Sequence, residues 1–549
     1  MTINMKKLII VGAQINLMVG DIEANTNRII QEAKNAVNLY QADIVVFPEL
    51  AISGYPPEDL IFRSGFNLNC MKAVETICQE MASFETTLIV GHPLQLSEKV
   101  YNQVSILQKG RILASYSKQE LPNYTVFDEK RYFHTGHKPC VININNYLIG
   151  VIICEDLWFP NASQQAVAAG AQLIVCINAS PFDRNQAQYR ETTLIERTQK
   201  NSVPFIYINL VGGQDELVFD GGSMVVNAEG RKVLQAPYFQ EELFPIEVSA
   251  LDNQKIIIEQ YPIPPTPSLE ENLYNALVLG VKDYIKKNHF SGAIIGLSGG
   301  IDSALMLVIA ADAIGPENVT AVMMPSKYTR AMSLEDAEKQ AKLLGTHYHV
   351  ISIDSIYSAF IQSLAAPFAN LPTDTTEENI QARIRGTLLM ALSNKTGNIV
   401  LATGNKSEMA AGYATLYGDM AGGFAALKDI PKTIIYRLAD YRNQQSESIP
   451  QRVIDRPPSA ELAEDQLDQD TLPPYEILDQ IIHLYIELDQ SPEMIYATGI
   501  DKATVDRIIK MINRNEYKRR QAPVGIRTTT RAFGKDRRYP ITSGYARNL

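Results

Sequence analysis

Apolar residues in the first 250 positions form short continuous runs, with stretches of helical spacing between them. Six runs predict buried strands, at residues 8–14, 44–47, 88–91, 148–154, 173–178 and 205–210. Between the first two runs, apolar residues recur every three or four positions from Ile29 to Tyr40, and Asn25 is predicted to cap that helix. Strands that alternate with helices predict sheets joined by crossover helices. We therefore predict an α/β fold for this half.

A proline-rich segment divides the chain. Residues 261–267 read Tyr-Pro-Ile-Pro-Pro-Thr-Pro, a sequence that can form neither a helix nor a central strand. A chain of 549 residues is also too long for one ordinary hydrophobic core. We therefore predict two domains, at residues 1–250 and 268–549, joined by a linker at 251–267.

The second half repeats the α/β pattern. A Ser-Leu-Glu-Glu capping box at 268–271 predicts a helix that runs to about residue 287. Predicted strands follow near residues 293–297, 319–325, 347–353 and 399–403, and they indicate a parallel sheet. Residues 443–474 are rich in Asp, Glu, Pro and Gln, and we expect them to form a mobile excursion.

The segment that follows the strand near 293–297 predicts a phosphate site. It reads Gly-Leu-Ser-Gly-Gly-Ile-Asp-Ser and leads into an apolar helix, so backbone N–H groups and the positive helix end can face an anion. A Walker loop would need a Lys, which is absent here. The segment instead resembles the PP-loop of ATP pyrophosphatases, which cleave ATP between its α- and β-phosphates. The residues that this resemblance assigns to ATP are Gly296, Leu297, Ser298, Gly299, Gly300, Ile301, Asp302 and Ser303.

Composition narrows the class of protein. The chain is 46% hydrophobic and 20% charged, and no apolar run is long enough to cross a membrane. Its net charge of −11 argues against a general nucleic-acid binder. Five scattered cysteines without a C-x-x-C pair indicate a reducing compartment and no structural zinc. We therefore expect a cytoplasmic protein, with a buried strand and not a signal peptide at its start.

Three reactive residues of the first half lie where a predicted strand ends. Glu49 ends Ile-Val-Val-Phe-Pro-Glu, Lys118 follows Ala-Ser-Tyr-Ser, and Cys154 ends Val-Ile-Ile-Cys. Such a trio can perform nucleophilic catalysis: Cys attacks, Glu takes its proton, and Lys stabilises the oxyanion and keeps the thiolate populated. Each of the three residues could instead have a purely structural role. A buried Cys, for example, is commonly a small hydrophobic core residue.

The contexts of these residues resemble the nitrilase (carbon–nitrogen hydrolase) superfamily. The matching segments are Phe-Pro-Glu-Leu at 47–50, Tyr-Ser-Lys at 116–118 and Ile-Cys-Glu-Asp-Leu-Trp at 153–158. The resemblance implies an α-β-β-α sandwich and amide hydrolysis through a thioester with release of ammonia. It assigns glutamine recognition to Tyr124, Ser180 and Gln186. Relatives often carry a basic residue at the position of Gln186, so Arg184 and Arg190 remain alternatives for the substrate carboxylate.

A second conspicuous segment of the C-terminal half is Leu-Ala-Thr-Gly-Asn-Lys-Ser-Glu at 401–408, directly after a predicted strand. Glu408 is predicted to pair with Asp302 around one Mg²⁺, which prefers hard oxygen ligands and phosphates. Thr403 is predicted to face the nucleotide. A strand-to-helix turn capped by Asn405 or Ser407 is compatible with both roles.

Five segments of this half resemble NAD⁺ synthetases, and the whole chain resembles the family in which that domain is joined to a nitrilase-like glutaminase. The segments are residues 378–386, 401–408, 456–462, 472–479 and 515–520. The resemblance implies that Asn379, Glu408 and Lys518 contact deamido-NAD⁺. It also implies ATP-dependent amidation of deamido-NAD⁺ with nitrogen from glutamine, no membrane or nucleic-acid partner, and a homo-oligomer formed through the synthetase domain.

Two alternatives remain open at this stage. One is an RNA-modifying or other PP-loop ligase fused to an amidase, which nine cations between Arg514 and Arg538 would suit. The other is a nonenzymatic assembly with one degenerate half. The intact Glu–Lys–Cys set and the intact phosphate loop argue against a degenerate half.

Overall fold

The computed structural model describes residues 7–251, 255–463, 466 and 468–544. The chain divides into two compact units, one of residues 1–214 and 218–266, the other of residues 215–217 and 267–549. The domain boundaries predicted above stay a prediction. Residues 256–258, placed in the predicted linker, form a strand of the first unit.

Two sheets form the centre of the first unit. One has seven strands in the order β15-β14-β1-β2-β3-β4-β5, and the other has six in the order β13-β12-β9-β8-β7-β6. The first contains β1 (Leu8–Gln14), β2 (Ile44–Val46), β3 (Thr87–Leu96), β4 (Lys99–Gln108), β5 (Arg111–Ser117), β14 (Glu242–Ala250) and β15 (Ile256–Ile258). The second contains β6 (Cys140–Ile144), β7 (Tyr147–Ile153), β8 (Leu173–Asn178), β9 (Phe205–Asn209), β12 (Met224–Val226) and β13 (Lys232–Gln235). A separate pair joins β10 (Val211–Gln214) to β11 (Leu217–Asp220).

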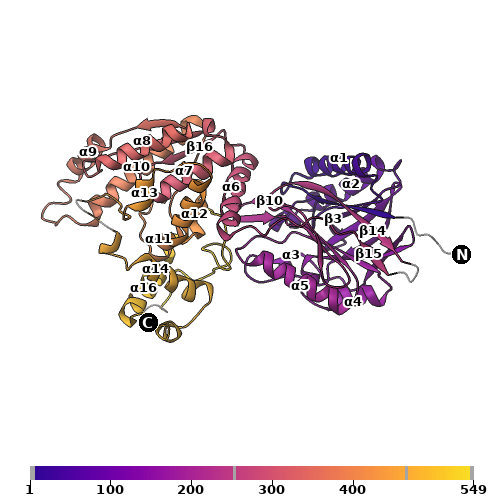
Figure 1. The fold of residues 1–549 in the computed structure, drawn as a ribbon. Helices are drawn as coiled ribbons and strands as arrows, with labels where there is room; N and C mark the ends of the chain where they lie inside the picture. Colours follow the sequence, from indigo (N-terminus) through magenta and orange to yellow (C-terminus); the bar gives the residue numbers. More distant parts are fainter. Residues whose placement is uncertain (1–6, 252–254, 464–465, 467, 545–549) are drawn as a thin grey trace. The chain divides into compact units, whose positions relative to one another are not determined.

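The two sheets pack face to face and helices cover their outer faces. One core combines residues of both sheets, among them Ile10, Ile44, Ile149 and Val175. Helices α1 (Ile22–Tyr40) and α2 (Ser64–Glu80) lie on one side, and α4 (Asn161–Ala168) and α5 (Gln186–Asn201) on the other (Figure 1). The predicted α-β-β-α sandwich is confirmed. Strands such as β8 are buried throughout, and apolar except for Asn178 at the end, because both of their faces are covered.

The predicted cap of the first helix is wrong. Asp21 caps α1, its side chain accepting a hydrogen bond from the backbone N–H of Ala24 at 3.1 Å. Asn25 lies inside the helix, where its buried amide donates to the carbonyl oxygens of Met18 and Ile52. Asp and Asn are both favoured as helix caps, so residue type alone did not distinguish Asp21 from Asn25.

A four-stranded parallel sheet forms the centre of the second unit. Its order is β18 (His347–Val350), β17 (Val319–Met323), β16 (Ala293–Gly296), β19 (Ile399–Val400). Helix α6 (Leu269–Lys287) begins at the predicted cap, where the Ser268 side chain accepts from the Glu271 N–H at 3.1 Å. Around the sheet lie α7 (Ile301–Ile314), α8 (Ala331–Leu344), α9 (Asp354–Leu364), α10 (Thr375–Thr396) and α12 (Lys432–Gln445).

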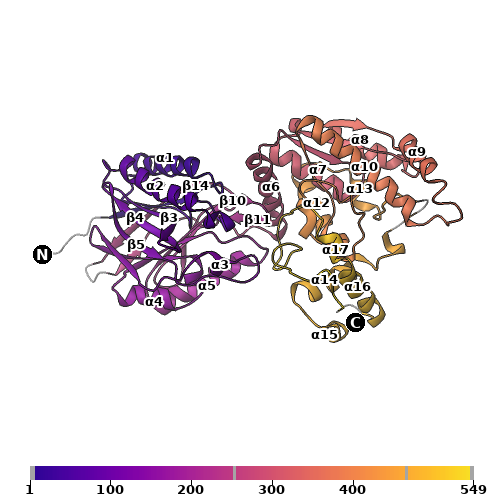
Figure 2. The same ribbon diagram turned by 180° about the vertical axis from the view of Figure 1, so that it is seen from behind.

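A second apolar core lies toward the end of the chain. It joins α11 (Lys406–Ala411), α14 (Tyr475–Ile482), α15 (Pro492–Tyr496) and α16 (Lys502–Arg514). In Figure 2, α14, α15 and α16 lie below the helices that surround the sheet. The short helix α17 (Glu516–Arg519) follows. The expected excursion at 443–474 is wrong in part, because α13 (Gln451–Asp455) forms there and buries Val453 and Ile454.

Candidate active sites

The structure brings Glu49, Lys118 and Cys154 together in the first unit. Glu49 follows β2 and Lys118 follows β5 in one sheet, whereas Cys154 follows β7 in the other. All three are buried, and the Lys118 Nζ lies 2.7 Å from Glu49 Oε1. The Glu49 carboxylate also accepts from the Asn102 amide at 2.7 Å and the Ala179 N–H at 3.0 Å. These donors fix the carboxylate in one orientation.

Cys154 lies on a strained turn. Its φ of 43° is in the left-handed region, which a non-glycine residue seldom adopts outside functional sites. The buried Asp156 carboxylate accepts from the backbone N–H groups of Ile153, Gln119 and Glu120 at 2.8–3.0 Å. Asp156 therefore ties the cysteine turn to the segment that carries Lys118.

The electrostatics of the site favour a protonated thiol in the resting state. Burial and the Glu49 carboxylate raise the pKa of Cys154 well above its ordinary value, against the opposing effect of Lys118. Burial lowers the pKa of Lys118, but the carboxylates of Glu129 and Glu49 raise it well above the ordinary value. Lys118 lowers the pKa of Cys154, as expected of it, but burial and Glu49 outweigh this effect. Glu49 would have to take the thiol proton as the nucleophile attacks.

Glu129 is a fourth buried charge that the sequence interpretation missed. It begins the short helix α3 (Glu129–Tyr132), and its Oε1 accepts from Lys118 Nζ and the Tyr55 hydroxyl, each at 2.9 Å. Burial raises the pKa of Glu129 to about 7, with Lys118 acting against it and Glu49 adding to it. No sequence signal marks Glu129, since it lies in a polar segment that follows no strand.

The predicted glutamine-binding residues lie around this centre. The Tyr124 hydroxyl donates to both carboxylate oxygens of Glu155, each at 3.0 Å, and both residues line a cavity of about 430 Å³. Ser180 is buried beyond the end of β8, and its N–H donates to Asn209 Oδ1 at 2.9 Å. Gln186 is the first residue of α5.

Arg190 is committed to an internal ion pair. It is 1% exposed, its Nη1 donates to Asp220 Oδ1 at 2.8 Å, and its Nη2 contacts the other Asp220 oxygen. Nη1 also donates to the Ser180 carbonyl at 3.3 Å. We therefore drop Arg190 as a candidate for the substrate carboxylate, which leaves Gln186 and the partly exposed Arg184.

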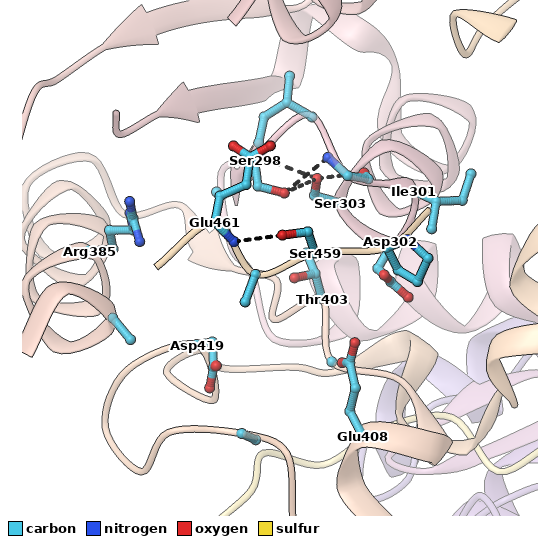
Figure 3. A pocket seen from close by; sticks show the side chains of 18 of the residues that line it. Ser298, Ile301, Asp302, Ser303, Arg385, Thr403, Glu408, Asp419, Ser459 and Glu461 are labelled. Carbon is cyan, nitrogen blue, oxygen red and sulfur yellow. Dashed lines mark hydrogen bonds between the residues drawn. The ribbon is translucent and has the colours of Figure 1, made fainter. Parts of the chain in front are cut away.

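A cavity of about 270 Å³ opens at the carboxyl end of the sheet in the second unit (Figure 3). The predicted phosphate loop joins β16 to α7 along one of its sides. The Ser298 and Ser303 hydroxyls lie 3.0 Å apart, and Ser298 accepts from the Gly300 N–H at 3.1 Å. Gly299 has a φ of +80°, and a Cβ there would lie 2.5 Å from the Ser333 carbonyl, so the turn requires glycine.

Asp302 and Glu408 both face the buried cation of Lys432. Lys432 Nζ contacts Asp302 and lies 3.6 Å from Glu408 Oε1. Burial lowers the pKa of Lys432, but the two carboxylates raise it well above the ordinary value. Burial and Asp302 raise the pKa of Glu408 to about 8, against the effect of Lys432. Sequence interpretation missed Lys432, which begins α12 far from either carboxylate in sequence.

Thr403 lines the cavity, and the segment that contains Glu408 has a capping role as well. Asn405 caps α11, its side-chain oxygen accepting from the Glu408 N–H at 3.0 Å, while its amide donates to Asp302 at 2.8 Å. The segment can therefore cap α11 through Asn405 and still present Thr403 and Glu408 to the cavity.

Asn379 and Lys518 do not line the cavity, but both contact the segment 412–415, in which Tyr413 and Ala414 do. The Lys518 ammonium donates to the carbonyl oxygens of Gly412 and Ala414, each at 2.9 Å. Asn379 accepts from the Thr415 hydroxyl at 2.7 Å. The two predicted dinucleotide residues therefore converge on one segment.

Several cations of the basic tail are neutralised within the second unit. Arg519, Arg527 and Arg537 are each less than 10% exposed. Arg519 and Arg537 pair with Glu516, and Arg527 pairs with Asp536 at 3.1 Å. These side chains stabilise the fold, so this part of the tail does not offer the exposed basic surface that a nucleic acid would need.

Comparison with known proteins defines the class. The family model for carbon-nitrogen hydrolases matches residues 10–255, and the model for NAD synthase matches residues 273–522. The protein is therefore an enzyme with a carbon-nitrogen hydrolase unit and an NAD synthase unit. Among the described residues, none of the helices has the length and apolar character needed to cross a membrane.

The similarity extends over the full chain. A glutamine-dependent NAD(+) synthetase of Acinetobacter baylyi is 47% identical over 544 residues, covering 98% of this chain and 99% of the relative. One of Thermotoga maritima is 43% identical and covers 99% and 100%. The solved structure of the Acinetobacter baumannii glutamine-dependent NAD+ synthetase with ADP has 43% identity, a TM-score of 0.79, and coverage of 98% and 99%. The chain belongs to the glutamine-dependent NAD(+) synthetase family.

Proposed function

We propose that this enzyme amidates deamido-NAD⁺ to NAD⁺, using ATP and the amide nitrogen of glutamine and releasing AMP, diphosphate and glutamate. The observation that carries the proposal is the presence in one chain of two separate clusters of reactive residues. One is the buried Glu49–Lys118–Cys154 set, and the other is the phosphate loop with its carboxylates. Ammonia made at the first centre is consumed at the second.

At the first centre, the Cys154 sulfur attacks the amide carbon of glutamine while Glu49 accepts its proton. Glu49 then gives that proton to the leaving ammonia. Lys118 has three N–H donors, of which Glu49 and Glu129 occupy two, so one remains for the developing oxyanion. Water then hydrolyses the thioester, which releases glutamate and the free thiol. We propose Tyr124, Ser180 and Gln186 as the groups that orient glutamine.

At the second centre, the nicotinate carboxylate of deamido-NAD⁺ attacks the α-phosphorus of ATP. Residues 296–303 hold the departing diphosphate at the start of α7, where backbone N–H groups and the helix dipole favour an anion. Ammonia then displaces AMP from the acyl-adenylate. Adenylation is required because a free carboxylate is a poor electrophile. We propose that Thr403 contacts ATP and that Asn379, Glu408 and Lys518 contact deamido-NAD⁺.

Mg²⁺ forms part of the proposal, with Asp302 and Glu408 as its protein ligands. Both carboxylates already face one cation, the Lys432 ammonium. The described residues contain no cluster of three or more His, Cys, Asp or Glu side chains able to hold a metal. A two-carboxylate site completed by phosphate oxygens and water is what Mg²⁺ commonly uses. When bound, Mg²⁺ would neutralise charge on the leaving diphosphate.

Lys518→Ala is expected to raise the apparent KM for deamido-NAD⁺ about tenfold and leave the KM for glutamine unchanged. The reason is that its ammonium fixes the segment 412–414 beside the cavity. Initial rates at varied deamido-NAD⁺ would measure this, with the exposed Lys502→Ala on α16 as the matched control. An unaltered deamido-NAD⁺ dependence would contradict the role given to Lys518.

We also propose that the enzyme is cytoplasmic and forms a homo-oligomer through its synthetase unit. A hollow of about 540 Å³ beside α10 is lined by apolar side chains that include Met390, Tyr417 and Pro523. Tyr417 is 67% exposed, and with its apolar neighbours in the hollow it offers a patch that a second copy of the chain could cover. Light scattering is expected to give a mass above one chain, and Tyr417→Asp to reduce it. A single-chain mass for the unaltered enzyme would contradict the proposal.

The function is tested by incubating the enzyme with ATP, Mg²⁺, glutamine and deamido-NAD⁺ and identifying the products by mass. NAD⁺, AMP and glutamate in equal amounts are expected. Formation of ADP in place of AMP would exclude attack at the α-phosphorus.

A further inference from the structure

The segment 472–479 takes no part in the proposed reaction steps, although it is one of the five segments that resemble NAD⁺ synthetases. Its last five residues begin helix α14. Tyr475 and Asp479 lie four positions apart, so they share one face of that helix. The described residues that line the cavity of the second unit include neither of them. Any effect of α14 on the reaction therefore passes through neighbouring side chains.

Asp479 gathers three donors on its two carboxylate oxygens. Oδ1 accepts from the Ser407 hydroxyl. Oδ2 accepts from the backbone N–H and from the hydroxyl of Thr433, at 2.9 and 2.8 Å. Burial raises the pKa of Asp479 above its ordinary value, against the effect of these hydrogen bonds. The carboxylate thereby joins the start of α11, which contains Ser407, to the start of α12, which contains Thr433.

Helix α12 depends on these partners for its first backbone donors. Pro431 precedes the helix, and its apolar side chain cannot cap it. The N–H of Lys432 donates instead to the Ser407 hydroxyl oxygen at 2.9 Å, and the N–H of Thr433 donates to Asp479. The first N–H groups of a helix have no partner within it, and the helix dipole favours a carboxylate beside them. Ser407 and Asp479 therefore fix the position at which α12 begins.

The two helix starts that Asp479 joins carry a charged pair of the cavity. Lys432 is the first residue of α12, and its ammonium faces Asp302 and Glu408. Glu408 directly follows Ser407 in α11. The same hydrogen-bonded set therefore holds the backbone on both sides of the Lys432–Glu408 pair, whose charged atoms lie 3.6 Å apart. A shift of either helix start would change this distance.

Tyr475 acts on the same ammonium from the side. The Lys432 Nζ lies 5.4 Å from the centre of the Tyr475 ring, within the range of a cation–π interaction. The Tyr475 hydroxyl donates at 2.8 Å to Asp468, another carboxylate that lines the cavity. Other buried side chains of α14 belong to the second apolar core, namely Leu478, Ile481 and Ile482. Helix α14 thus connects a packed core to the charged groups of the cavity.

We propose that Asp479 is a positioning residue of the adenylation step and that it acts through Lys432. The inference rests on the proposed function, because it concerns the ATP-dependent half of that reaction. Asp479 fixes the starts of α11 and α12, and these in turn fix the Lys432 ammonium against Asp302 and Glu408. A cation that is already in place stabilises the charge that develops on phosphate oxygens without having to reorganise during the reaction.

The test is a double-mutant cycle on the exchange of labelled diphosphate into ATP, which depends on deamido-NAD⁺ and reports adenylation alone. Asp479→Ala should slow this exchange about 10- to 100-fold, a common cost of removing a residue that orients a reacting group. In Lys432→Met, which removes the ammonium and keeps an unbranched side chain, the same substitution should cost less than about twofold. Calorimetric titration with ATP and Mg²⁺ should show the same dependence on Lys432 without any turnover.

Three further variants complete the design. Asp479→Asn keeps an acceptor for Thr433 and should lose less activity than Asp479→Ala. Ser407→Ala removes the acceptor of the Lys432 N–H and leaves the Thr433 bonds in place. It should slow exchange in the same Lys432-dependent way, and it carries the test if Asp479→Ala does not fold. Glu476→Ala removes an exposed carboxylate of the same helix and should leave exchange unchanged.

Two results would overturn the inference: an exchange rate in Asp479→Ala within about twofold of the unaltered enzyme, or an equal loss in the presence and absence of the Lys432 ammonium. The first shows that Lys432 is held in place without Asp479, and the second assigns Asp479 to the stability of the fold alone. Failure of the proposed function has a different signature, because the unaltered enzyme would then show no exchange dependent on deamido-NAD⁺.

Discussion

Cys154→Ala is expected to abolish NAD⁺ formation from glutamine and to preserve it with ammonium salts. The thiol is the only nucleophile placed beside Glu49 and Lys118 in the described site, and its loss removes thioester formation. Removal of a catalytic nucleophile commonly costs about 10⁴- to 10⁶-fold in rate. The synthetase centre lies in the other unit and keeps its own residues.

Initial rates with each nitrogen source measure this effect. Cys78→Ala on α2 serves as the matched control, since it removes another buried thiol far from Glu49 in the sequence. Continued use of glutamine by Cys154→Ala would show that the nucleophile has been assigned to the wrong residue. Equal loss with both nitrogen sources would indicate a defect in folding.

Asp302→Asn is expected to remove NAD⁺ formation with either nitrogen source and to leave glutamine hydrolysis in place. The substitution keeps the shape of the side chain but removes one of the two carboxylates that face Lys432. Loss of one electrostatic group at a phosphoryl-transfer site typically costs about 10²- to 10³-fold.

Diphosphate exchange and glutamate release are the two readouts for Asp302→Asn. Asp440→Asn, which alters an exposed carboxylate of the same unit, should match the unaltered enzyme in both. A normal ammonium-driven rate in Asp302→Asn would remove Asp302 from the reaction.

Sequence patterns predicted the parts of the fold that are apolar and continuous. The runs at 8–14 and 173–178 coincide with β1 and β8 because both faces of these strands are buried. The strands β4 and β5 were missed because polar and apolar residues mix along them, and β5 exposes much of its length. The apolar signal is weak in β4 because buried polar residues such as Asn102 and Ser105 interrupt it, and in β5 because much of the strand contacts water.

The same reasoning explains what the sequence showed of the two sites. Glu49 and Lys118 follow strands of one sheet and Cys154 follows a strand of the other, and the packing of the two sheets brings these strand ends together. Glu129 and Lys432 begin helices and reach their sites through tertiary packing that no local pattern encodes. The spacing of residues in the sequence therefore could not identify these two charged side chains as part of a site.

The central claim is that the deamido-NAD⁺ carboxylate is activated by AMP and then receives the glutamine nitrogen. It is tested most directly with deamido-NAD⁺ labelled with ¹⁸O in its carboxylate and glutamine labelled with ¹⁵N in its amide. The account predicts NAD⁺ that carries ¹⁵N and one ¹⁸O, and AMP that carries the other ¹⁸O. Appearance of the ¹⁸O in diphosphate or in ADP, or NAD⁺ without ¹⁵N, would contradict it.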